Sequence, residues 1–179
     1  MRRIGPALLL ATAGAACTAL GLGPTPEITS HPADFAVEYR WQEGSLPPPY
    51  HYEYVIRLGP GARGEIEFTP DYSFANPPVW TETFDLSGDD LTALYKLMTA
   101  QGVFDRRWRQ QEPPPVGGGS AAADITAGGQ HVAIPALLEA EDEQAIGEVY
   151  AAIRALVPQA IWDKLRAQHE EYQQAHPDE

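Results

Sequence analysis

The sequence has a single cysteine, Cys17, among its 179 residues. It therefore forms no internal disulfide, and a folded core must hold without one. Basic residues are also scarce: 12 lysines and arginines stand against 25 aspartates and glutamates, and the formal net charge is −13. A surface of this sign repels phosphate backbones and anionic lipid headgroups, so nucleic-acid binding and electrostatic adsorption to membranes are disfavoured.

Signatures of metal binding and catalysis are absent from the sequence as well. Its five histidines form no H-E-x-x-H motif and no closely spaced pair, which argues against a structural zinc site. The acidic run at 139–143 lacks the register of a calcium loop, and Ser120 lacks the G-x-S-x-G frame of a hydrolase. Residues 59–64 spell G-x-G-x-x-G, but a strand pattern follows them instead of a helix, so we expect a hairpin loop there. We expect no metal and no cofactor.

The N-terminal segment has the pattern of an export signal. Arg2 and Arg3 precede an apolar stretch from Ile4 to Ala16, and small residues lead up to Cys17. The segment resembles the signal of bacterial lipoproteins, in which cleavage before the cysteine leaves that residue as the lipidated N-terminus. The resemblance implies a signal peptide over residues 1–16 and a lipid anchor on Cys17.

Residues 17–33 are expected to hold this lipidated cysteine and a flexible tether, because Gly, Pro and Thr are frequent after it. Several acyl chains would give a stable membrane attachment. Two alternatives stay open: ordinary signal cleavage near Ala13-Gly14-Ala15, and an uncleaved membrane span over Ile4 to Leu22. All three interpretations place the rest of the chain outside the cytoplasm. The favoured one places it in the cell envelope, anchored to a membrane and facing the periplasm or the exterior.

Alternating apolar and polar residues predict a sheet after the tether. The period of two marks strands over 35–42, 50–58, 65–68 and 80–86. A second hairpin is expected over 121–135, where Gly128 and Gly129 form the turn between further strands. About six strands of this kind predict an antiparallel sheet with one solvated face.

Three segments have helical periodicity. Ser87 is a candidate N-cap for a helix whose apolar residues recur up to Met98, and Gly102 is expected to end it. An acidic segment begins a second helix with an apolar stripe from Ile146 to Val157. We therefore predict an α+β fold, in which a central helix and C-terminal helices pack on the sheet. The globular domain is expected over 34–157, followed by a C-terminal helix and charged tail over 158–179.

Two groups of residues are candidates for binding. Arg106, Arg107, Trp108 and Arg109 form the one strongly basic cluster of an acidic chain, and we expect Trp108 to be exposed there as part of an interaction surface. The arginines could equally form salt bridges to their own domain. A second group could be a platform for sugar rings or a peptide, although Ile56 and Leu58 on the same strand face favour burial: it comprises Tyr50, Tyr52, Tyr54, Trp41, Trp80 and Trp108.

A catalytic alternative depends on three polar residues. His51 and Glu53 could form an acid/base pair on one strand face, and His131 on the later hairpin is a further candidate. Neighbouring polar residues are common on a solvated strand face, however. We therefore expect no catalytic residues and keep an envelope enzyme as the alternative.

Residues 84–157 combine a capped helix ending in Gly-Val-Phe, a Gly-Gly hairpin and a closing amphipathic helix. This order loosely resembles the emfourin-type inhibitors of bacterial metalloproteases. The resemblance implies a secreted protease inhibitor as a further alternative, but it assigns no inhibitory residue in this chain. The sequence thus favours a lipid-anchored envelope protein that binds an envelope protein or a glycan without catalysis.

Overall fold

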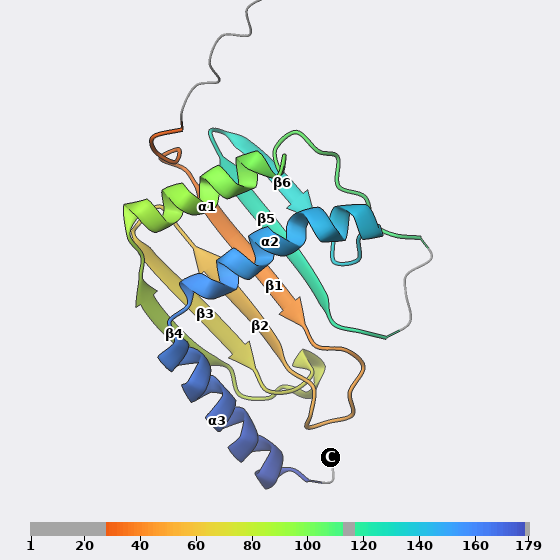
Figure 1. Cartoon of the computed structure of the whole chain (residues 1–179). Helices are drawn as coiled ribbons and strands as arrows, with labels where there is room; N and C mark the ends of the chain where they lie inside the picture. Colours follow the sequence, from red (N-terminus) through yellow and green to blue (C-terminus); the bar gives the residue numbers. More distant parts are fainter. Residues whose placement is uncertain (1–27, 113–116, 178–179) are drawn as a thin grey trace, which may run out of the picture.

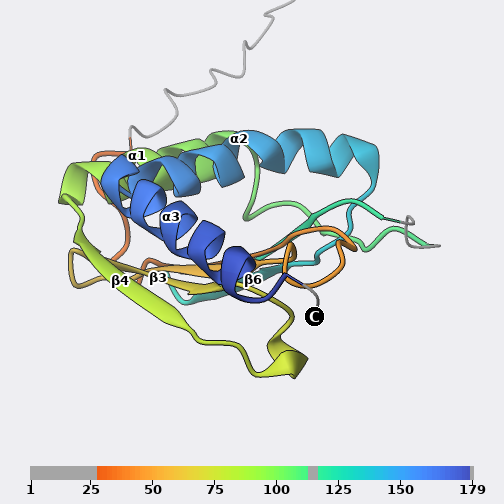
Figure 2. The same ribbon diagram turned by 90° about the horizontal axis from the view of Figure 1, so that it is seen from below.

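The structure is a computed structural model that describes residues 28–112 and 117–177. These residues form one six-stranded antiparallel sheet in the order β4-β3-β2-β1-β5-β6, so the predicted α+β fold is confirmed (Figure 1). Figure 2 shows that all three helices lie on the same face of the sheet. The strands are β1 (Ala36–Gln42), β2 (Glu53–Leu58), β3 (Arg63–Thr69), β4 (Trp80–Asp85), β5 (Ser120–Ala127) and β6 (Gln130–Ile134). The helices are α1 (Gly88–Ala100), α2 (Ala140–Leu156), α3 (Gln159–Ala175) and the short 3-10 helix η1 (Ser73–Ala75).

The core lies between the sheet and the helices. The strand alternation seen in the sequence produces it, because every second residue of β1, β2 and β3 points toward the helices and, apart from the half-buried Trp41, is buried. β1 is central: Tyr39 is opposite Ile56 of β2 on one side and Ala123 of β5 on the other. Burial of apolar surface on this one face is the main stabilising contribution.

Tight turns join β2 to β3 and β5 to β6, as the sequence predicted. The segment with the G-x-G-x-x-G spelling joins antiparallel β2 and β3, so it is a hairpin loop, and Gly64 already pairs with Leu58. Gly128 and Gly129 have positive φ angles and form the turn between β5 and β6. The Asp34 carboxylate accepts hydrogen bonds from the backbone N–H groups of both glycines, at 2.7 and 2.6 Å. These bonds hold the incoming chain at the hairpin end of the sheet.

Local signals also fix the helices. Ser87 and Asp90 form a reciprocal capping box at the start of α1, and Gly102 follows its end with a φ of 68°. α1 and α2 lie side by side and run across the strands of the sheet (Figure 1). Pro158 separates α2 from α3, which packs on the part of the sheet formed by β2, β3 and β4. The single fully buried residue of α3 is Leu165.

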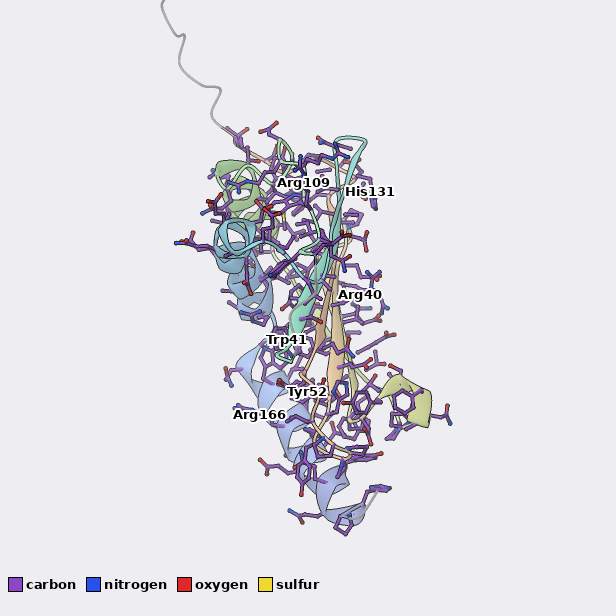
Figure 3. The ribbon with its side chains drawn as sticks, turned by 90° about the vertical axis from the view of Figure 1, so that its right-hand side faces the viewer. Arg40, Trp41, Tyr52, Arg109, His131 and Arg166 are labelled. Carbon is purple, nitrogen blue, oxygen red and sulfur yellow. The ribbon has the colours of Figure 1, made fainter. Side chains whose placement is uncertain are left out.

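The opposite face of the sheet is open and charged. Arg57 forms ion pairs with carboxylates of β1 and β3, and Arg40 pairs with Glu38 and with Asp124 of β5. Figure 3 shows Arg40 and His131 on this face, away from the helices. Because these side chains are well exposed, each pair contributes little to stability, and the face is explained as a solvated surface.

Candidate ligand-binding pocket

Aromatic side chains from β1, β2, β3, β4 and α3 form a continuous cluster. Tyr52 and Phe68 are nearly parallel, with ring centroids 5.4 Å apart and an interplanar angle of 8°. Trp162 of α3 meets Tyr54 edge-on at 5.1 Å, and His169 meets Tyr52 edge-on at 5.4 Å. Tyr52 and Tyr54 share a face because they are two residues apart in the extended chain that leads into β2, and Phe68 of β3 lies opposite Tyr54. The α3 residues share a face because they lie about two turns apart. Sequence periodicity thus aligns two aromatic surfaces toward each other.

These surfaces do not close completely. Between α3 and the sheet is a pocket of about 430 Å³. A pocket of this size suits a small molecule, and aromatic walls with a few polar groups are the usual composition of such sites. Its lining residues are Tyr52, Tyr54, Phe68, Arg154, Trp162, Arg166 and His169. We call this cavity the α3 pocket.

Two arginines line the α3 pocket, and they differ in their partners. Arg166 is exposed and forms an ion pair with Asp163 on α3 itself. Arg154 is half-buried near the end of α2, and one of its N–H groups donates to the Tyr39 hydroxyl at 2.8 Å. Its guanidinium carbon lies 5.9 Å from the centre of the Tyr39 ring. Among the described residues, no carboxylate forms an ion pair with Arg154.

The protonation states around the α3 pocket suit binding. Burial raises the pKa of Tyr54, and burial followed by the Glu43 carboxylate raises that of Tyr52 to about 12, so both phenols are neutral at pH 7. Burial lowers the pKa of His169. The Pro49 carbonyl, 3.2 Å from Nε2, raises that pKa but has the smaller effect. That imidazole is therefore neutral at pH 7. Stacking surfaces, neutral hydrogen-bonding groups and two cations can hold a ligand, and the lining contains no carboxylate, serine or thiol that could act as a nucleophile.

A neighbouring cavity of about 500 Å³ lies against α2 and shares Arg154 with the α3 pocket. Tyr150 also lines it, and the Tyr150 hydroxyl is buried without a hydrogen-bond partner among the described residues. Gln111 and Gly117, on either side of the segment that is not described, belong to its lining. The lining of the α3 pocket, by contrast, lies away from that segment.

The structure changes the interpretation of the predicted basic cluster. Trp108, which we expected to be exposed, is half-buried against the core, and its indole N–H donates to the Val103 carbonyl at 3.1 Å. Arg106 lies over the Trp108 ring at 5.7 Å and forms an ion pair with Asp142 at 3.0 Å. The prediction of an exposed Trp108 was wrong because the turn after α1 folds the indole back onto Val103. All three arginines of the cluster are exposed, and Arg107 and Arg109 are the two that the Asp142 ion pair does not involve.

The predicted aromatic platform is partly assembled. Tyr52, Tyr54, Trp41 and Trp80 belong to the cluster beneath α3, whereas Tyr50 is half exposed and Trp108 lies beside Val103. Figure 3 shows Trp41, Tyr52 and Arg166 on the helix side of the sheet.

Two of the three catalytic candidates, His51 and Glu53, lie together, whereas His131 lies apart from them. His51 was expected on a solvated strand face, but its side chain is fully buried and stacks on Tyr72 at a ring separation of 3.7 Å. The reason is that His51 precedes β2, which begins at Glu53, and that the Tyr72 ring covers it. Its two ring nitrogens lie 3.2 Å from the Gly44 carbonyl and 3.2 Å from the Glu53 carboxylate.

Glu53 also accepts a hydrogen bond from the Ser73 hydroxyl at 2.5 Å. His51, Glu53 and Ser73 therefore tie the loop before β2 to η1. His131 is exposed on β6, 3.6 Å from Asp124, at the other edge of the sheet. Within the described ranges, no three His, Cys, Asp or Glu residues are grouped so that they could hold a metal ion.

Sequence reasoning missed Arg154 and Trp162 as pocket residues. The available signal was that Arg154 follows Tyr150 by four positions and precedes Val157 by three, which places a charge on the apolar stripe of α2.

Cys17, the predicted lipidation site, lies outside the described residues. In the described part of the chain, no helix has the length and apolar character needed to cross a membrane. No protein-family model matches the chain, and comparison with curated proteins finds no match.

Proposed function

We propose that this protein is a lipid-anchored component of the cell envelope that binds a small ligand in the α3 pocket without catalysing a reaction. The observation that carries the binding half of the proposal is the pocket itself: about 430 Å³ between aromatic walls, with a half-buried arginine that has no acidic partner among the described residues. The anchoring half rests on the N-terminal pattern that ends at Cys17.

The chemistry of the polar groups supports binding over catalysis. General acid–base or nucleophilic catalysis needs a titratable or nucleophilic side chain that reaches the substrate. His51 has no exposed surface, and His131 lies on the open face of the sheet (Figure 3). The pocket offers His169 alone as a base, and its Nε2 lies at hydrogen-bond distance from the Pro49 carbonyl.

The arrangement of the domain is compatible with an N-terminal anchor. The described chain enters at the end of the sheet where the β5–β6 turn lies, and Asp34 holds it there. α3 extends toward the opposite end of the sheet, where the chain passes from β1 to β2 (Figure 1). A domain attached to a bilayer through its N-terminal side would therefore present the α3 pocket away from the membrane.

A ligand screen by NMR tests the binding half. The protein is screened against a chemically mixed fragment set that contains acids, neutral sugars and amides, and the four tryptophan indole N–H signals are followed. We expect bound fragments to shift the Trp162 signal first, and Trp162→Ala to abolish this binding. Trp108→Ala is the matched control, since it removes an indole outside the pocket. A screen in which no fragment shifts the Trp162 signal would contradict the proposal.

A further inference from the structure

Arg154 is a cation without a counter-charge among the residues that the structure describes. The chain has about twice as many acidic as basic residues, yet none of the described acids forms an ion pair with this half-buried guanidinium. Half-buried charges in proteins are normally paired, because removing a charge from water is costly. We propose that the α3 pocket binds a small ligand that combines a planar apolar ring with a carboxylate, and that Arg154 receives the carboxylate. This inference rests on the proposed function, in which the α3 pocket is a ligand site.

The position of Arg154 favours an external anion as its partner. A cation in the last turn of α2 is favoured by the helix dipole, which explains a basic residue there but not its side-chain direction. The side chain lies over the Tyr39 ring, where one N–H donates to the Tyr39 hydroxyl and the group lines the pocket. A guanidinium has five N–H donors in a planar fork, so donors beyond the Tyr39 bond are free to bind a carboxylate with two hydrogen bonds.

The walls specify the remainder of the ligand. The rings of Tyr52, Phe68 and Tyr54 are nearly parallel, with interplanar angles of 10° or less. The Trp162 ring is nearly perpendicular to them, at 77° to Tyr54. Parallel rings opposite an edge-on indole form a surface against which a flat group stacks. A monoanion suits this site better than a phosphate, because only one guanidinium is half-buried and a doubly charged group would lose more hydration.

The test compares two probes that differ in charge. The binding of 2-naphthylacetate and of its uncharged amide, 2-naphthylacetamide, is measured by titration calorimetry with the full chain. We expect the acid to bind about ten- to a hundred-fold more tightly, the range for a hydrogen-bonded charge pair. Arg154→Gln should remove this preference and leave binding of the amide nearly unchanged. Arg63→Gln is the matched control, because it removes the same charge from an exposed site at the start of β3.

Circular dichroism establishes whether Arg154→Gln is folded. If it is not, Arg154→Lys replaces it: a lysine keeps the charge but not the fork, so the preference should fall severalfold without disappearing. Equal binding of the two probes by the wild-type protein would overturn the carboxylate proposal. So would an unchanged preference in a folded Arg154→Gln protein.

The experiments distinguish a wrong ligand class from a pocket that binds no ligand. If neither naphthyl probe binds but other fragments shift the Trp162 signal, the carboxylate inference is wrong and the pocket remains a binding site. If no fragment of any class shifts that signal, the proposed binding function itself fails.

Discussion

Packing of α3 on the sheet depends on one fully buried side chain, so Leu165→Ala is the sharpest structural perturbation of the pocket. Leu165 is 0% exposed, and the other residues of α3 that face the sheet are only half-buried. Removing three carbon atoms costs about 2.4 kcal/mol at about 0.8 kcal/mol for each buried methylene. A residual cavity raises the cost into the range of about 2–5 kcal/mol observed for such changes, and we expect about 3 kcal/mol.

Urea unfolding followed by tryptophan fluorescence measures this loss of unfolding free energy. With a slope of about 2 kcal/mol per molar urea, the midpoint should fall by about 1.5 M. Leu46→Ala is the control: Leu46 is 41% exposed, so its change should stay within about 0.5 kcal/mol. A midpoint for Leu165→Ala equal to that of the control would refute the reasoning, since α3 would then not be held as part of the cooperative core.

Three further changes test individual parts of the fold. Gly64→Ala should destabilise the protein by about 1–3 kcal/mol in urea unfolding, because a Cβ there would lie 2.3 Å from the Phe84 ring. Gly61→Ala is the control, since its Cβ meets nothing within 4 Å and the change should be nearly neutral. Equal stabilities of the two variants would contradict this packing. Ser87→Ala should cost about 1 kcal/mol in thermal unfolding through loss of the α1 cap, and a loss near zero would show that the capping box contributes nothing. Burial lowers the folded-state pKa of His169 below its unfolded value of about 6.5, so stability should fall as pH drops from that value through the folded pKa. His169→Gln should flatten this part of a pH–stability curve, and an unchanged slope would contradict the assignment.

Much of the fold follows from local sequence signals. The alternation from Phe35 to Trp41 predicts the central strand because only one face of the sheet is covered. Ser87 and Gly102 mark the limits of α1, since capping chemistry depends on a few adjacent residues. Such signals require no knowledge of which distant segments meet.

The α3 pocket could be predicted only by knowing which distant segments meet. Periodicity places Trp162 and His169 on one face of a helix but does not reveal that this face crosses β2 and β3. The burial of Trp108 depends on a turn that returns its indole to Val103, and the burial of His51 depends on where β2 begins. Both are properties of tertiary packing, and they reversed expectations that were based on charge and alternation alone.

The function proposed for this protein has two parts that can fail separately. Loss of the α3 pocket as a binding site would leave a lipid-anchored domain with a different surface, for which Arg107 and Arg109 remain exposed candidates. Loss of the lipid anchor would leave a secreted binding protein, and protease inhibition would then be the next activity to assay.

Membrane anchoring distinguishes an envelope protein from the secreted alternative most directly, and it is tested by the intact mass of the protein purified from its native membrane. We predict a mass equal to residues 17–179 plus glyceride and acyl groups on Cys17. Cys17→Ser should lose this added mass and leave the membrane fraction while keeping the fold. An unlipidated mass for a chain that begins before Cys17 would contradict the account.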